Sequence, residues 1–299
     1  MHTLLSSVGF GLVTASILAI AAVGFTLQFG VTNMLNLAYG DIMTASAFAG
    51  YVVNKAGAPL WVCVVAAALA GAAVSFVVHR FVYRPFVRRG TRLFGLVVVA
   101  LSVAVIIQNA LLAGFGATFF SYRLPHDSSV SFADMTFTVR QLVIIGIAVA
   151  VMLGINALLR ATRLGKAMRA TSGNAALARG CGINTGRVVG TAWLIAGGLC
   201  GLAGVMLVLN TSSFQSTTGN DFLVITIAAA MLGGVGQAYG AMIGAVVLGV
   251  VTEVAAAYTR SSFKEVVAFV VLVAILLLRP QGLFGPPGGS TVTEKEAVA

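Results

Sequence analysis

Polar side chains gather in one apolar stretch near the N-terminus, which reads LQFGVTNMLNLAYGDIMTASAF. Asn33 and Asn36 are three residues apart and would share one face of a helix, with Gly40 and Asp41 one turn further on. Amide and carboxylate groups inside an apolar helix can line a polar path, and they can equally join two helices or lie in a loop. Asp41 is the only acidic residue among the first 126. Replacement of Asp41 is therefore the most direct single test of a path-lining role.

A second pair of amides, Gln108 and Asn109, lies within a later apolar run. Hydrogen bonding between packed helices is the commoner role for such a pair, and lining of the same path is the alternative. Glu253 also lies in an apolar run, near its end, where a solvated helix terminus and a buried site both fit the sequence. The candidate path residues are Asn33, Asn36, Asp41, Gln108 and Asn109.

The sequence offers no constellation for enzymatic chemistry. His2, His79 and His126 are scattered over the ends of apolar runs and loops, without a nucleophile partner or HExxH spacing. The three cysteines show no CxxC or CxxH spacing, and no GxxxxGK[ST] phosphate loop occurs. We therefore expect no catalytic residues, no metal and no cofactor, and no ATP site in this chain itself.

A basic segment, residues 160–188, separates two long apolar runs and carries six Lys and Arg residues but no acid. Ser172 or Asn174 can cap a helix within it, and Gly180 or Gly182 can end that helix in the left-handed conformation. The segment therefore predicts a helix of two to three turns at the membrane surface. Anionic lipid headgroups alone would explain the charge. The small side chains of Gly173, Ala175, Ala176 and Ala178 favour docking against another protein.

Composition defines the elements that must position these residues. The chain has 299 residues, of which 59% are hydrophobic and 9% charged, and its mean hydropathy is +1.01. So few charges cannot cover a soluble globule of this size. Long apolar runs without alternation predict membrane-spanning helices rather than barrel strands.

Nine apolar runs follow one another along the chain. They cover residues 8–29, 35–53, 60–78, 93–114, 142–159, 188–209, 222–234, 241–257 and 266–278. The run 222–234 is too short to cross ~30 Å of hydrocarbon comfortably, which predicts a broken or re-entrant helix there. The sequence GVTN after Phe29 leaves almost no room for a loop. We expect an all-α, polytopic bundle of eight spans, within a range of seven to nine.

The basic residues also set the orientation. The net charge is +10, but eleven of the 18 Lys and Arg lie in two short clusters, 80–92 and 160–187. Such clusters next to apolar runs follow the positive-inside bias and do not indicate nucleic-acid binding. Placing both clusters in the cytoplasm puts residues 114–138 outside. The N-terminus then lies outside if both early segments cross.

Several separate motifs resemble one known family, the permease subunits of branched-chain amino acid ABC importers, and the shorter LivH type more closely than LivM. The motifs are GVTNMLNLAYGDIMTASAF, RFVYRPFVRRG followed by SVAVIIQN, GCGINTGRV, MLGGVGQAYGAMIGAVVLG and LLLRPQGLFG. They occur in order over nearly the whole chain. We expect one membrane domain, residues 1–285, which includes the cytoplasmic loop 160–188, followed by a disordered tail, 286–299.

The resemblance also implies an assembly at a bacterial inner membrane. Its members are a second permease, alike or different, two cytoplasmic ATP-binding subunits that bind the ATP, and a periplasmic substrate-binding protein. Loop 160–188 would correspond to the coupling element that fits the ATPase, although the usual Glu-Ala-Ala opening is absent. The residues that would make this contact are Arg169, Asn174, Ala175, Ala176, Ala178, Gly182 and Ile183.

The resemblance determines the substrate less closely than the class. Branched-chain or related amino acids are expected, and urea and short amides are the alternative within the family. A self-sufficient channel or secondary carrier is a further alternative. A proton-coupled carrier would be expected to hold more acids inside its spans than Asp41 and Glu253.

Overall fold

The computed structural model describes residues 2–123, 129–132, 135–234, 236–258, 263–278 and 282–284. Its helices are α1 (His2–Thr32), α2 (Tyr39–Lys55), α3 (Leu60–Val78), α4 (Arg84–Arg88), α5 (Leu93–Phe115), α6 (Val139–Ala161), α7 (Arg163–Gly173), α8 (Ala175–Gly180), α9 (Thr185–Thr211), α10 (Thr218–Gly233), α11 (Ala238–Tyr258) and α12 (Lys264–Leu278). A π-helical turn, His79–Tyr83, joins α3 to α4. The predicted helical membrane bundle is confirmed. One short antiparallel hairpin, β1 (Ser129–Phe132) and β2 (Met135–Thr138), is added to it.

Six helical stretches of the described chain are long and apolar enough to cross a membrane. They are Ser7–Thr32, Leu60–Arg88, Leu93–Phe115, Val139–Ala161, Thr185–Thr211 and Ala238–Tyr258. The expected short helix is present as α10, whose 16 residues extend about 24 Å at 1.5 Å per residue. The helices α2 and α12 have 17 and 15 residues. The predicted count of eight spans is therefore not confirmed, and the predicted tail 286–299 lies outside the described residues.

The centre of the bundle is formed by α1 and α9. In their most apolar windows 72% and 78% of residues are buried, whereas for α3–α4, α5 and α6 the share is 28% or less. Small residues permit the close packing: a Cβ added at Gly201 of α9 would lie 2.2 Å from the carbonyl oxygen of Ala67 in α3. The outer helices α3, α5 and α6 keep apolar faces that stay exposed.

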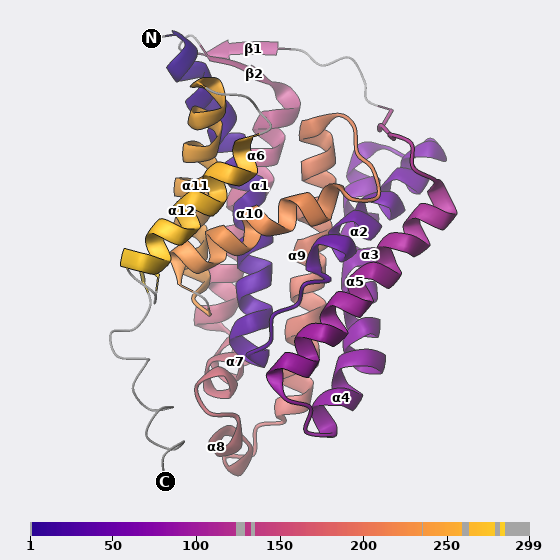
Figure 1. Ribbon diagram of the computed structural model, residues 1–299, viewed down its shortest axis with the longest axis vertical. Helices are drawn as coiled ribbons and strands as arrows, with labels where there is room; N and C mark the ends of the chain where they lie inside the picture. The colour runs from indigo at the N-terminus through magenta and orange to yellow at the C-terminus, as the bar shows by residue number, and fades with distance from the viewer. Residues whose placement is uncertain are drawn as a thin grey trace.

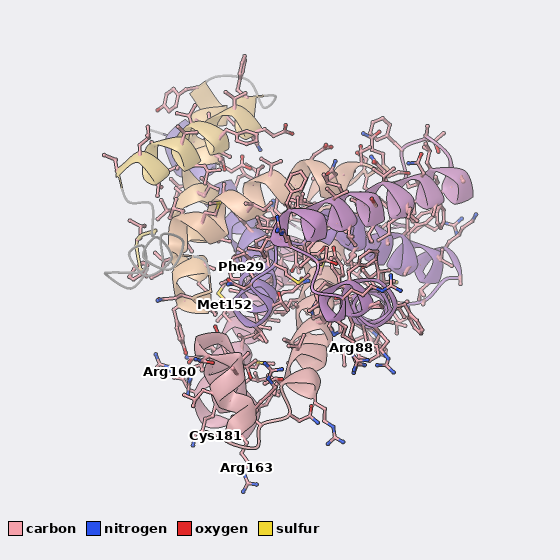
Figure 2. The ribbon with its side chains drawn as sticks, turned by 60° about the horizontal axis from the view of Figure 1, so that its bottom comes forward. Phe29, Arg88, Met152, Arg160, Arg163 and Cys181 are labelled. Atoms are coloured by element: carbon pink, nitrogen blue, oxygen red, sulfur yellow. The ribbon has the colours of Figure 1, made fainter. Side chains whose placement is uncertain are left out.

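The basic clusters lie together at one end of the molecule. In Figure 1, α4, α7 and α8 lie at the bottom, and the hairpin and the start of α1 lie at the top. Figure 2 turns the bottom forward, and Arg88, Arg160 and Arg163 all lie on that side. We call these the basic end and the hairpin end. The predicted placement of both clusters on one side, with the N-terminus and residues of the 114–138 segment on the other, agrees with this arrangement.

The chain leaves the helical conformation directly after α1. Asn33 has a left-handed backbone, with φ of 54°, and its N–H donates to the Phe29 carbonyl at 2.7 Å. Asparagine adopts this conformation more readily than most residues, which ends the helix. The prediction that Asn33 and Asn36 share a helix face is therefore wrong. They lie in an irregular stretch between α1 and α2, which we call the break (residues 33–38), and α2 begins near the middle of the molecule (Figure 1).

Candidate functional site

A buried chain of hydrogen bonds connects the break to two helices. Tyr83 of the π-helical turn donates its hydroxyl to Asn36 Oδ1 at 2.9 Å, and Asn36 Nδ2 donates to Gln28 Oε1 of α1 at 3.4 Å. All three residues are at most 2% exposed. We call them the Asn36 cluster. Asn36, one of the predicted path residues, therefore joins three segments of the chain at their meeting point.

Aromatic rings and unpaired polar atoms surround this cluster. Trp193 of α9 packs against His79 and Tyr83, with ring centroids 5.0 and 4.9 Å apart. Among the described residues, no partner is found for Gln28 Nε2, His79 Nδ1 or Trp193 Nε1, although all three atoms are buried. Buried polar atoms normally bind a protein group or a water molecule. The site thus has unused hydrogen-bonding capacity beside a π-helical turn, a feature frequent at functional sites.

Asp41 lies in the first turn of α2 and is 1% exposed. Its Oδ1 has no hydrogen-bond partner among the described groups. The neighbouring backbone is tightly packed, because Gly219 of α10 donates its N–H to Thr44 Oγ1 at 2.9 Å, and Gly40 and Gly219 leave no room for a Cβ. The start of α2 therefore meets the start of α10 through Gly40 and Thr44, next to Asp41 in the sequence. The positive end of the α2 dipole partly offsets the cost of burying it.

The other three path candidates, Asn33, Gln108 and Asn109, are not buried as Asn36 and Asp41 are. Asn33 is exposed, Gln108 is half-buried and Asn109 is exposed on α5. Asn109 Nδ2 donates to the Val105 carbonyl of its own helix at 2.8 Å. No pattern in the sequence distinguishes these amides from the buried Asn36, because the exposure of each side chain depends on which neighbour its helix packs against. Gln28 and Tyr83, which complete the Asn36 cluster, were not among the predicted path residues.

At the basic end, Asn174 caps α8 as the sequence predicted. Its Oδ1 accepts from the N–H groups of Ala176 and Leu177 at 3.0 and 2.9 Å. Gly182, with φ of 83°, follows the helix in the left-handed conformation. The helix is shorter than predicted, because the backbone of Asn174 is extended and divides the segment into α7 and the six-residue α8. Ser172 belongs to α7 and does not cap α8.

Only part of the predicted coupling set faces outward. Ala175 and Ala176 are exposed, whereas Ala178 is 4% exposed and Ile183 is half-buried. Arg169 Nη1 donates to the Leu159 carbonyl at 2.9 Å and so ties α7 to the end of α6. Leu177, which is 66% exposed, was missed by the sequence reasoning. Its signal was a single large apolar side chain among the small residues of NAALAR.

Aromatic residues close the bundle toward the hairpin end. Phe120 and Phe214 exchange two backbone hydrogen bonds, at 2.8 and 2.9 Å, and so link the loop after α5 to the loop after α9. Both rings pack with Phe48 of α2. Tyr122 donates its hydroxyl to the Ala47 carbonyl at 2.7 Å, and burial raises the pKa of this phenol. No motif in the sequence pointed to this cluster.

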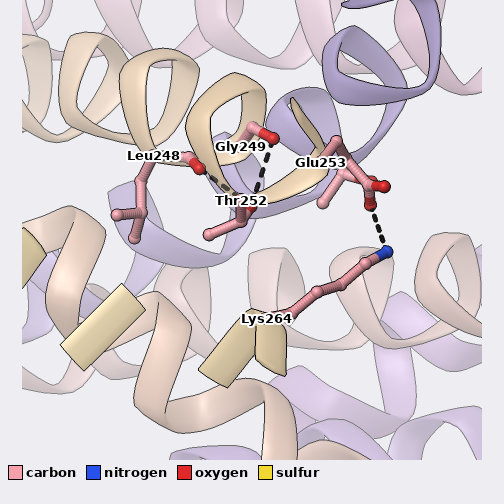
Figure 3. A network of polar contacts seen from close by, with 6 residues as sticks. Leu248, Gly249, Thr252, Glu253 and Lys264 are labelled. Carbon is pink, nitrogen blue, oxygen red and sulfur yellow. Dashed lines mark hydrogen bonds and ion pairs between the residues drawn. The ribbon is translucent and has the colours of Figure 1, made fainter. Parts of the chain in front are cut away.

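Glu253 occupies a half-buried, paired site rather than a solvated helix end, with its side chain 14% exposed. Its Oε1 lies 2.6 Å from Lys264 Nζ of α12 and accepts from Thr14 Oγ1 of α1 at 2.9 Å. Figure 3 shows that the Thr252 hydroxyl instead donates to carbonyls of the preceding turn, including that of Leu248 at 2.8 Å. A paired carboxylate of this kind holds three helices together, which favours a structural role.

These features define a multi-pass helical membrane protein of the permease class, with a polar break at its centre and a capped surface helix at its basic end. Residues 7–276 match the family described as branched-chain amino acid transport system / permease component, and the chain belongs to that family.

The curated relatives cover almost the full chain. The high-affinity branched-chain amino acid transport system permease protein LivH of Salmonella typhimurium is 30% identical over 93% of this chain and 94% of its own. BraD of Pseudomonas aeruginosa, with the same description, is 28% identical over 93% and 94%. Among solved structures, the fold resembles PsaBC from Streptococcus pneumoniae in complex with Fab, with a TM-score of 0.52, 13% identity and 92% of each chain covered. At that identity the likeness shows the fold alone.

Proposed function

We propose that this protein is the membrane-spanning permease subunit of an ABC importer that moves branched-chain or related amino acids across a bacterial inner membrane. The observation that carries the proposal is the family match over residues 7–276. Relatives described as high-affinity branched-chain amino acid permeases cover 93% of the chain, which supports the substrate class. The protein is a transport subunit without catalytic residues, metal or cofactor of its own, and ATP is bound by its partners.

We assign the partners to the two ends and the outer faces of the molecule. Two cytoplasmic ATP-binding subunits serve the assembly, and one contacts α8 through exposed Ala175, Ala176 and Leu177. A periplasmic substrate-binding protein delivers the amino acid to the hairpin end. A second permease, identical or different, packs against the outer helices, whose apolar faces are exposed.

The geometry supports a route for motion from α8 to the Asn36 cluster. The chain runs from α8 through Gly182 into α9, and Asn184 caps α9 by accepting from the Arg187 N–H at 3.1 Å. Two turns further along α9, Trp193 packs against Tyr83, which holds Asn36. Displacement of α8 by the ATPase would therefore be transmitted to the break. Asp41 lies in the first turn of α2, the helix that follows the break.

The test is reconstitution with and without the ATPases. Proteoliposomes that hold the permeases, both ATP-binding subunits and the binding protein should accumulate labelled leucine only with ATP. Urea offered with its own binding protein tests the alternative substrate class. Leucine uptake by the chain alone, without ATPase subunits, would show a self-sufficient carrier and overturn the proposal.

A further inference from the structure

A cavity of about 420 Å³ lies at the basic end, outside the Asn36 cluster. Its walls come from the last turns of α1, the end of α6, the second half of α7 and the first residues of α11. The volume falls within the range of roughly 300–1,000 Å³ typical of small-molecule sites. The cavity therefore lies where the segment that carries α8 joins the body of the bundle.

One part of the wall is polar and basic. Arg169 lines the cavity, and its bond to the Leu159 carbonyl fixes the guanidinium in place. Tyr239 lines it too, and Arg160 lies over the Tyr239 ring at 4.8 Å while its Nε donates to the Tyr239 hydroxyl at 2.7 Å. None of the described residues that line the cavity is acidic. Arg169 is the only charged side chain among the described residues of the wall, and a carboxylate is an anionic group that matches a guanidinium.

The rest of the wall is mostly apolar, with Ser172 and Gln237 as further polar side chains. Leu27, Val31 and Met168 line the cavity from α1 and α7. Thr26 lines it as well, is fully buried, and its Oγ1 has no hydrogen-bond partner among the described groups. Such a group ordinarily binds a protein group or a water molecule. The cavity thus offers cationic, hydrogen-bonding and apolar surfaces within one small volume.

We propose that this cavity binds a free aliphatic amino acid from the cytoplasmic side, with its carboxylate at Arg169 and its side chain against Leu27 and Val31. The identity of the ligand rests on the proposed function, because the delivered amino acid is the aliphatic carboxylate that accumulates on this side. Arg169 holds α7 to α6, so a bound ligand between α7 and α1 resists displacement of α7 and α8. Accumulated amino acid therefore slows the transporter.

One glycine allows the cavity to be filled without distortion. A Cβ added at Gly173 meets no atom within 4 Å and the residue lines the cavity, so we expect Gly173→Leu to place its side chain at the cavity without distorting the wall. Gly146 of α6 is a matched control, since its added Cβ also meets nothing and it lies outside the cavity wall.

The first measurement is equilibrium binding of labelled leucine to the complete transporter in nanodiscs, without the binding protein. Wild type and Gly146→Leu should bind leucine, and Gly173→Leu should lose at least tenfold in affinity. The amine 3-methylbutylamine, which lacks the carboxylate, should not compete. Binding that is absent in wild type, unchanged in Gly173→Leu, or replaced by a co-purified anionic lipid overturns the proposal.

The second measurement is ATP hydrolysis by inverted proteoliposomes that enclose loaded binding protein. Leucine added on the ATPase side should lower the rate at least threefold in wild type and Gly146→Leu, each relative to its own rate without leucine. The same addition should leave Gly173→Leu at its own uninhibited rate. If the transporter takes up leucine but leucine on the ATPase side does not inhibit ATP hydrolysis, only this inference is refuted. If there is no ATP-driven leucine uptake, the proposed function is refuted.

Discussion

Replacement of Asp41 by asparagine separates a transport role from a packing role at the start of α2. The side chain is 1% exposed, and one of its carboxylate oxygens has no partner among the described groups. Asparagine has nearly the same shape, so Asp41→Asn removes the carboxylate without opening a void. Any change in uptake or stability then reports the loss of that group.

The expected sign of the stability change follows from two opposing terms. A carboxylate in the first turn of a helix gains up to about 2 kcal/mol from the helix dipole in a partly buried site. Burial of an ionised carboxylate costs several kcal/mol after relaxation. Because the cost exceeds the gain, Asp41→Asn should leave the free energy of unfolding unchanged or raise it. An ionisable side chain that stability does not favour inside a membrane bundle is a candidate for function, so uptake should fall at least tenfold, equivalent to about 1.4 kcal/mol in the rate-limiting step.

The assay pairs thermal unfolding of the purified complex with ATP-dependent uptake of labelled leucine. Ser46→Ala is the matched control, because Ser46 is also buried in α2 and donates only to the Ile42 carbonyl of its own helix, at 2.7 Å. The control should transport normally. Normal uptake by Asp41→Asn, or a loss of uptake that parallels a fall in melting temperature, would refute the reasoning.

Three further changes test other parts of the structure. Ala176→Trp adds a large group to the exposed face of α8 and should abolish coupling between ATP hydrolysis and uptake, measured together in proteoliposomes, without a change in melting temperature. Tyr83→Phe leaves Asn36 Oδ1 without its donor and should destabilise the protein by about 1 kcal/mol, seen in thermal unfolding. Glu253→Gln leaves Lys264 without its charge partner and should cost about 1 kcal/mol, since the side chains are 14% and 33% exposed.

Two of these changes have a control in the chain. Gly114→Trp on exposed α5 carries the same added group away from α8 and should stay coupled; equal uncoupling in both variants contradicts docking at α8. Adding Lys264→Met to Glu253→Gln should restore part of the stability, and a further loss would show that the pair is not the cause.

The helical bundle could be predicted because its causes are local. Apolar runs specify spans, the two basic clusters specify one end, and Asn174 and Gly182 specify the limits of α8, each through side chains close in sequence. The length of α8 could not be predicted, since both Ser172 and Asn174 are good caps. Only the extended backbone at Asn174 shows which one divides the segment.

The candidate site was less predictable because it depends on contacts between distant segments. Asn33 and Asn36 look alike in sequence, but one is exposed and the other bonds to Tyr83, 47 positions later in the chain. The helical spacing of these two asparagines gave the wrong face, because Asn33 ends α1 in the left-handed conformation. No local pattern distinguishes an asparagine that continues a helix from one that ends it.

The break after α1 is better explained by transport than by packing. Irregular backbone within a membrane is tolerated only where protein or a water-filled cavity covers it, because each unsatisfied N–H or C=O costs several kcal/mol in hydrocarbon. A continuous helix followed by a loop at the basic end would avoid that cost and the unpaired atoms of Gln28, His79 and Trp193. The break instead places Asn36 against Tyr83, which Trp193 connects to the helix that follows α8. The break is thus both energetically costly and the segment to which motion of α8 would be transmitted. This combination is expected of a segment that changes conformation during each transport cycle.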